Sequence, residues 1–218
     1  MNLQAELQKT REEFSEQIPE NISEIMTNAT ETLIQSGIVE KSLKEGEQMP
    51  VFSLTDAINE IVSSDIFLKK GPLVINFYRG GWCPYCNLEL KAFQDLLPEM
   101  TLLGARLIAI SPNLPDKSLS SIEKNALSFQ VLSDVHNRVA RQFGLVYTLD
   151  KKLQPLYKQM GIDLPEFNCD ESYELPLPAT YVVDTNGMIK LAFADADYTK
   201  RLDPDKVIEK LKGLNNLI

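Results

Sequence analysis

The sequence predicts an α/β protein in which helices cover a mostly parallel sheet and a helical hairpin precedes that sheet. From about residue 50 onward, short apolar runs alternate with amphipathic helical segments, whereas the first 45 residues show only helical periodicity. The chain has 218 residues, of which 44% are hydrophobic and 24% charged. These values are ordinary for a globular protein with one domain and an extension.

Residues 1–45 carry apolar side chains at intervals of three, four and seven. One stripe comprises Leu3, Leu7, Phe14 and Ile18, and a second runs from Ile22 to Ile34. Such spacing puts one apolar face on each of two helices. We therefore predict an N-terminal helical extension over 1–45 and a second domain over 46–218. The hairpin should pack on its own domain or on a second subunit, which makes a homodimer one expectation.

The later part of the chain alternates strands with helices. The predicted strands cover 73–78, 104–112 and 129–134, and the predicted helices cover 84–100, 118–127 and 136–145. Asn186-Gly187 separates two β-rich runs, which indicates a hairpin. Asp203 is a suitable N-cap for a closing helix. Residues 145–178 have weak periodicity and four prolines, so we expect a partly helical insertion that borders the active site.

Charge and composition exclude several classes of function. The formal net charge is −9, which argues against nucleic acid as a partner because binding to phosphates needs clustered Lys and Arg. The N-terminus lacks the pattern of a signal peptide, and no apolar run approaches the roughly 18 residues of a membrane span. Three cysteines are too few for a disulfide framework, so we expect a cytoplasmic protein without a membrane segment.

Two of the three cysteines, Cys83 and Cys86, stand in the stretch FYRGGWCPYCNLEL (77–90). The stretch places Cys83 at a helix N-terminus, with Pro84 in the first turn, and Cys86 about one turn inside. Free N–H groups and the positive end of the helix dipole both favour a thiolate there. A thiolate is the nucleophile in disulfide exchange and peroxide reduction, so both cysteines are candidate catalytic residues that could pair in a redox-active disulfide.

A structural zinc site is the main alternative use of this pair. Zinc commonly takes four ligands, but beyond the pair the chain offers only the distant Cys169 and a single histidine, His136. We therefore predict neither a metal nor a cofactor. Cys169 is interpreted as an unpaired loop thiol rather than a resolving cysteine.

Three neighbours of the pair could support redox chemistry. Arg79 could stabilise a thiolate or orient a bound oxygen species, although a surface salt bridge is an equal alternative. Trp82 could form an apolar docking surface or simply pack. Glu89 could accept a proton or hold Arg79, but the favoured interpretation is a solvated helix residue.

From about Gly46 to Leu211 the chain resembles the peroxiredoxin-like (alkyl hydroperoxide reductase/thiol-specific antioxidant) family of the thioredoxin-fold superfamily. The resemblance rests on GEQMPVFSL, LVINFYRGGWCPYCNLEL, GARLIAISP, FQVLSDVHNRVARQFGL and LPLPATYVVDTNGMIKLAF, which match the family's strands in order. It implies a thioredoxin-like fold with a central mixed sheet flanked by helices.

The resemblance also implies roles for particular residues. The cysteine that attacks peroxide in peroxiredoxins falls on Cys86. The preceding family Thr falls on Cys83, the family Pro on Arg79, and a peroxide-binding Arg on Pro178. The chain thus departs from the peroxiredoxin pattern at three supporting positions.

The departures resemble thioredoxins and glutaredoxins instead. WCPYC is similar to the Trp-Cys-x-x-Cys and Cys-Pro-Tyr-Cys motifs of those proteins, in which the first cysteine attacks; here that is Cys83. LPATYVV resembles their cis-proline segment, which implies that Pro178 is cis and faces the dithiol.

Three functions follow from these features. The favoured one is a thiol-dependent peroxidase that reduces hydrogen peroxide or organic hydroperoxides through a Cys83/Cys86 dithiol-disulfide cycle, with thioredoxin or a similar dithiol as reductant. The alternative is a thioredoxin-like protein disulfide oxidoreductase. A third hypothesis is a redox switch that controls partner binding through the acidic hairpin. Because Cys83 is at the helix start, we expect it to have the lower pKa of the pair.

Overall fold

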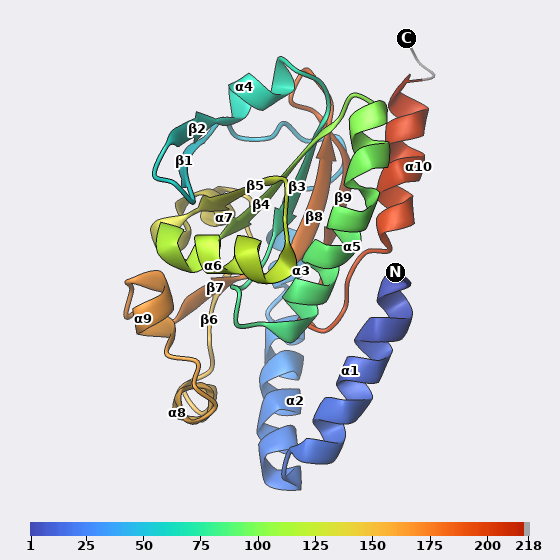
Figure 1. Cartoon of the computed structure of the whole chain (residues 1–218). Coiled ribbons are helices and arrows are strands. Elements are labelled where there is room, and N and C mark those ends of the chain that lie inside the picture. The colour runs from blue at the N-terminus through green and yellow to red at the C-terminus, as the bar shows by residue number, and fades with distance from the viewer. Residues whose placement is uncertain (216–218) are drawn as a thin grey trace.

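The computed structural model describes residues 1–215 and has a seven-stranded sheet at its centre (Figure 1). The strands of this sheet are β1 (Ser53–Asp56), β2 (Ile61–Ser63), β3 (Leu73–Phe77), β4 (Arg106–Ser111), β5 (Gln130–Ser133), β8 (Ala179–Val183) and β9 (Ile189–Ala194). They lie in the order β2-β1-β5-β4-β3-β8-β9. β3, β4 and β5 are parallel, and the other neighbours pair antiparallel. The mixed sheet that the family resemblance implies is therefore confirmed. The mostly parallel sheet expected from the alternation of strands and helices is wrong, because only two of its six strand pairs are parallel.

Helices cover both faces of the sheet (Figure 1). One face carries α5 (Pro84–Leu102), α6 (Pro115–Asn125) and α10 (Pro204–Asn215), and the other carries α3 (Ile38–Lys41), α4 (Ser64–Leu68) and α7 (Arg138–Gln142). β3 is buried along its whole length, with Val74 in the core under α5 and Ile75 in the core on the opposite face. A central strand buried on both faces must be apolar throughout, as this one nearly is.

The first two helices form the predicted hairpin, α1 (Leu3–Gln17) and α2 (Glu20–Gln35), which extends beyond the end of the sheet (Figure 1). α1 packs on α5, and its Leu3 and Leu7 are buried in the same core as Phe93. The hairpin therefore packs on its own chain. The domain boundary at residue 45 and a homodimer stay predictions.

The segment 145–178 contains α8 (Leu153–Gln159) and α9 (Leu164–Asn168), as its expected partial helicity predicts. It also contains a two-stranded antiparallel sheet of β6 (Val146–Thr148) and β7 (Glu174–Pro176), which the sequence did not indicate. Each of these strands has three residues, which is too short for a visible alternation.

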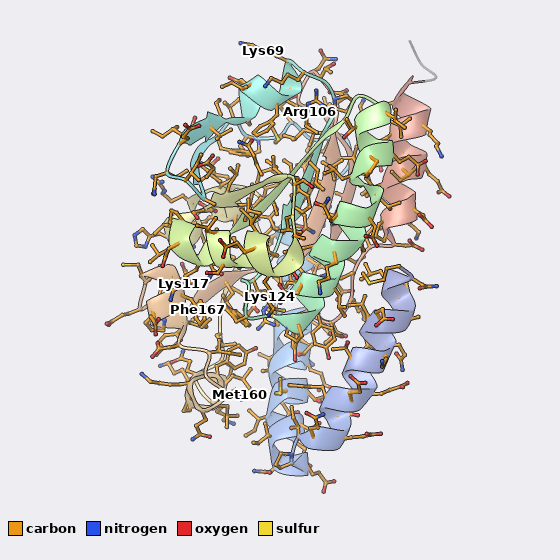
Figure 2. All side chains as sticks on the ribbon, viewed as in Figure 1. Lys69, Arg106, Lys117, Lys124, Met160 and Phe167 are labelled. Atoms are coloured by element: carbon orange, nitrogen blue, oxygen red, sulfur yellow. The ribbon has the colours of Figure 1, made fainter. Side chains whose placement is uncertain are left out.

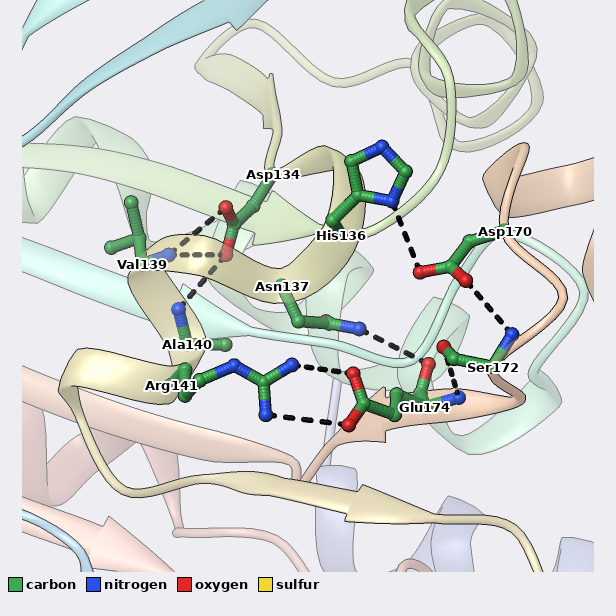
Figure 3. Close-up of polar contacts among 9 residues, drawn as sticks. All are labelled: Asp134, His136, Asn137, Val139, Ala140, Arg141, Asp170, Ser172 and Glu174. Carbon is green, nitrogen blue, oxygen red and sulfur yellow. Dashed lines mark hydrogen bonds and ion pairs between the residues drawn. The ribbon is translucent and has the colours of Figure 1, made fainter.

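Charged side chains tie this segment to the rest of the domain. The 3₁₀ turn Val135–Asn137 leads into α7, where the Asp134 carboxylate accepts hydrogen bonds from the backbone N–H groups of Val139 and Ala140. Arg141 then donates to both carboxylate oxygens of Glu174 in β7 (Figure 3). A bidentate pair of this kind fixes orientation as well as distance.

A second tie joins α6 to α9. The Lys117 ammonium lies 3.0 Å from a carboxylate oxygen of Glu166 and 5.3 Å from the ring centroid of Phe167. Figure 2 shows Lys117 and Phe167 beside one another where the two helices meet. The insertion is thereby held against α6.

The end of the domain follows the predictions from the sequence. β8 and β9 form a hairpin across Asn186-Gly187, and Gly187 has a φ of 81° that suits glycine. The Asp203 carboxylate accepts from the backbone N–H of Asp205 at 3.1 Å, so Asp203 caps α10 as expected. Within the described residues, no helix combines the length and apolar character that crossing a membrane requires.

Candidate active site

The CPYC motif lies where the chain passes from β3 into α5. Cys83 is the N-cap residue of α5, Pro84 is the first helical residue, and Cys86 follows within the first turn. Both thiols are free, and the residues are 1% and 0% exposed. The motif therefore occupies the strand-to-helix junction that the sequence predicts.

Glycines make the turn before Cys83 possible. Gly80 has a φ of 148°, and a Cβ there would lie 2.4 Å from the Trp82 indole nitrogen. A Cβ on Gly81 would lie 2.1 Å from the Ser121 hydroxyl. The Gly81 N–H instead donates to the Asn113 side-chain oxygen at 3.1 Å. The turn is thus held against α6 and the loop before it, which fixes the approach of the chain to the dithiol.

Arg79 is buried among aromatic rings beside this turn, at 2% exposure. Its guanidinium carbon lies 4.2 Å from the ring centroid of Tyr198, 4.9 Å from that of Trp82 and 5.7 Å from that of Tyr157. It donates a hydrogen bond to the Tyr157 hydroxyl, and Tyr157 also packs edge-on against Trp82. The interpretation of Arg79 as a surface salt bridge is therefore wrong, because three rings enclose a desolvated cation.

The two thiols have opposite pKa shifts. For Cys83 burial acts to raise the pKa, but hydrogen bonding with Cys86 and the charges of Arg79 and Arg201 outweigh it and lower the pKa to about 6. Burial raises the pKa of Cys86, and the neighbouring Cys83 thiolate raises it further. The two thiols therefore titrate as an interacting pair, in which Cys83 has the lowered pKa and Cys86 the raised one.

A second buried arginine lies against Cys86. Arg201 donates from one terminal nitrogen to the Cys86 sulfur at 3.2 Å and from Nε to a Glu89 carboxylate oxygen at 2.7 Å. The other Glu89 oxygen accepts from the Thr180 hydroxyl at 3.5 Å. Arg201 and Glu89 have 0% and 1% exposed side chains. Burial raises the pKa of Glu89 to about 7, against the opposing effect of Arg201.

The favoured interpretation of Glu89 is wrong. Glu89 is not a solvated helix residue, and it holds Arg201 rather than Arg79. Residues 195–204 carry Arg201 and Tyr198 into the site. The three-residue spacing between Cys86 and Glu89, which puts both on one helix face, was a usable signal for Glu89. No local pattern marks Arg201.

Pro178 also differs from its prediction. The described residues contain no cis peptide bond, so the bond between Leu177 and Pro178 is trans. The Leu177 N–H donates to the Leu145 carbonyl at 2.8 Å, and Ala179 pairs with Phe77 in β3. The chain therefore runs extended from β7 into β8 and needs no reversal at the proline. Pro178 itself is buried.

The remaining candidate ligands lie away from the dithiol. Cys169 is exposed and free, and His136 forms an exposed pair with Asp170 at 3.1 Å (Figure 3). In the part of the chain that the structure describes, no three His, Cys, Asp or Glu side chains are grouped in a way that could hold a metal ion.

Arg79→Met is expected to raise the pKa of Cys83 by on the order of one pH unit, because it removes a positive charge that stabilises the thiolate. The measurement is the ultraviolet absorbance of the thiolate against pH. Tyr157→Phe is the matched control, since it removes the hydroxyl that binds Arg79 but keeps the charge. An unchanged titration in Arg79→Met would show that Arg79 does not act on this thiol.

A thioredoxin-like sheet with a buried, free dithiol at the start of the following helix defines a thiol-based redox protein. Consistent with this, residues 46–192 match the model of the AhpC/TSA family. The chain belongs to this family. The match leaves out the α1–α2 hairpin and Arg201.

Two relatives of the chain are peroxiredoxins. The chain is 36% identical over 103 residues to a putative peroxiredoxin bcp of Haemophilus influenzae, an alignment that spans 47% of this chain and 66% of that protein. It is 30% identical over 184 residues to the chloroplastic peroxiredoxin Q of Suaeda salsa, covering 84% of this chain and 72% of that protein.

A solved structure with the same fold is peroxidoxin BcpB of Mycobacterium tuberculosis. Its TM-score is 0.63 at 23% sequence identity, and the comparison covers 79% of this chain and 98% of that one. This likeness shows the thioredoxin-type fold that the sequence predicts.

Proposed function

We propose that the chain is a thiol-dependent peroxidase that reduces hydrogen peroxide or organic hydroperoxides through Cys83 and Cys86. The chain belongs to the AhpC/TSA family, and the two relatives described above are peroxiredoxins. Both findings support an oxidoreductase. The single observation that carries the assignment to this dithiol is the pair of free, buried thiols at the first turn of α5, with the Arg201 guanidinium 3.2 Å from the Cys86 sulfur. The nearby arginines and the hydrogen bond with Cys86 lower the pKa of Cys83 to about 6. At neutral pH such a thiol is mostly a thiolate, the form that attacks peroxide.

In the first step, the Cys83 thiolate attacks one oxygen of the peroxide. The O–O bond breaks, the sulfur becomes a sulfenic acid, and the leaving oxygen takes a proton to become water or an alcohol. The charge of Arg79 acts on the Cys83 sulfur and lowers its pKa. The same charge can stabilise the negative charge that moves onto the leaving oxygen.

In the second step, Cys86 attacks the sulfenic sulfur of Cys83. This forms the Cys83–Cys86 disulfide, and the hydroxyl leaves as water after taking a proton. Cys86 must lose its own proton to attack, and Arg201 at 3.2 Å stabilises the resulting thiolate. Arg201 and Glu89 are thus proposed as positioning residues for Cys86.

An external dithiol, thioredoxin or a similar protein, returns the disulfide to two thiols and is itself oxidised. We place this cycle in the cytoplasm, which the small number of cysteines supports. Chloroplastic relatives exist, so localisation of a tagged chain tests the compartment. The predicted homodimer is tested by analytical ultracentrifugation, which measures the mass of the protein in solution.

Rapid mixing with hydrogen peroxide tests the function. Trp82 is the only tryptophan of the chain and packs beside Arg79, so its fluorescence should change as the dithiol oxidises. We expect a fast change in the reduced protein that disappears in the double variant Cys83→Ser/Cys86→Ser. A slow reaction with peroxide together with fast reduction of a protein disulfide would favour the disulfide oxidoreductase instead.

A further inference from the structure

A cavity of about 160 Å³ lies between α2 and the 145–178 segment, and Arg79 is part of its lining. Apolar side chains from both sides line it: Met26, Ala29 and Leu33 from α2, and Leu149, Leu153 and Tyr157 from the insertion. The rest of the lining consists of Arg79, four hydroxyl-bearing residues, two further tyrosines, one alanine and one aspartate: Thr30, Thr32, Ser36, Thr148, Tyr147, Tyr198, Ala196 and Asp150. Neither wall belongs to the dithiol junction itself, and α2 lies outside the family match.

Arg79, which is part of the cavity lining, carries a hydrogen-bond donor that the protein leaves unused. The Arg79 Nε is buried, and no group in residues 1–215 accepts its hydrogen. A buried donor without a partner is unfavourable, so an oxygen atom of a bound molecule would be stabilised there. Because the charge of Arg79 lowers the pKa of Cys83, an oxygen at Arg79 is also in the electrostatic field of the reacting sulfur.

The cavity is large enough for a molecule bigger than hydrogen peroxide. An apolar cavity of about 150 Å³ in another protein is large enough to bind benzene. Hydrogen peroxide would make no use of the Met26, Ala29 and Leu33 wall, whereas a hydroperoxide on a ring-sized apolar group would fill it.

We propose that α2 is a specificity element: its Ala29 face binds the apolar body of an organic hydroperoxide whose oxygens lie at Arg79. This inference rests on the proposed peroxidase function and extends it to the choice of substrate. It assigns Met26, Ala29 and Leu33 to substrate discrimination.

The test fills the cavity and compares two peroxides. Ala29→Phe should lower kcat/KM for cumene hydroperoxide at least about tenfold relative to that for hydrogen peroxide, because a filled pocket rejects the ring. Ala29→Leu should give an intermediate ratio, which guards against a fold defect in the larger variant. Asn28→Phe, on the exposed face of the same helix, should leave the ratio as in the unaltered chain.

Binding gives an independent readout. The product alcohol 2-phenyl-2-propanol should change Trp82 fluorescence in the reduced protein, since Trp82 contacts Tyr157 and Arg79 at the cavity wall. This change should weaken in Ala29→Leu and Ala29→Phe. If the enzyme is active and the ratio of kcat/KM for cumene hydroperoxide to that for hydrogen peroxide is the same in the Ala29 variants and in Asn28→Phe, the role of α2 is overturned. The proposed peroxidase function would stand in that case. No oxidation by either peroxide would overturn the proposed function, and the substrate assignment with it.

Discussion

Arg201→Leu is expected to lower the free energy of unfolding by about 3 to 5 kcal/mol at neutral pH, the usual cost of removing one partner of a buried ion pair. Arg201 and Glu89 are both desolvated, and their carboxylate–guanidinium contact is 2.7 Å long. Without Arg201, the protein must bury an unpaired carboxylate or protonate it. Denaturant unfolding followed by circular dichroism measures the loss.

The loss of stability in Arg201→Leu should be larger at alkaline pH than at acidic pH. A raised carboxyl pKa means that the folded state holds its proton where the unfolded state has lost it, so stability falls as pH rises between the two pKa values. In the unaltered chain this interval runs from the ordinary Glu value of 4.5 to about 7. Removing Arg201 raises the pKa of Glu89 further, so the variant should be closer to the unaltered chain at pH 5 than at pH 8.

Two companion variants separate the ion pair from other effects. Lys200→Leu changes the neighbouring residue, an exposed lysine 3.7 Å from Asp195, and should cost no more than about 1 kcal/mol. Glu89→Leu/Arg201→Leu replaces both charges with apolar groups and should recover much of the stability. A single Arg201→Leu that costs less than about 1 kcal/mol would show that Glu89 does not depend on its partner.

The sequence predicted the frame of the site because local patterns define it. The apolar run of β3, the glycines before Cys83 and Pro84 at the first helical position each restrict the backbone within a few residues. These restraints are enough to put two thiols at a helix start. They also made Cys83 the expected site of the lower pKa.

The burial of Glu89 and the position of Arg201 depend on tertiary contacts, which local sequence patterns do not predict. Glu89 is buried because Arg201 pairs with it, and charged residues are rarely buried without a partner. Arg201 lies 112 positions after Glu89 in the sequence, and no periodic pattern of residues indicates that the two are in contact. The error at Pro178 has a different origin, since family likeness suggested a cis peptide bond where the chain runs with a trans bond from β7 into β8.

Cys83→Ser is expected to slow oxidation by peroxide at pH 7 on the order of a thousandfold or more, because it removes the nucleophile. Cys86 remains, and burial, the largest cause of its raised pKa, persists in this variant although the effect of Cys83 is lost, so we expect Cys86 to stay mostly a thiol at this pH. The unaltered chain should react faster as pH rises through about 6, where Cys83 becomes a thiolate, and then level off. In Cys83→Ser, the residual rate should still be rising at alkaline pH.

Cys86→Ser should behave differently, and this contrast decides which sulfur attacks. The serine hydroxyl can still donate to Cys83, so the first oxidation should stay fast while no disulfide forms. Mass spectrometry after one equivalent of peroxide should then find a sulfenic acid, trapped by dimedone, on Cys83. Fast oxidation surviving in Cys83→Ser at pH 7, with the sulfenic acid on Cys86, would reverse the two roles. The 3.2 Å contact from Arg201 would then stabilise the attacking thiolate, and Arg79 would serve the resolving one.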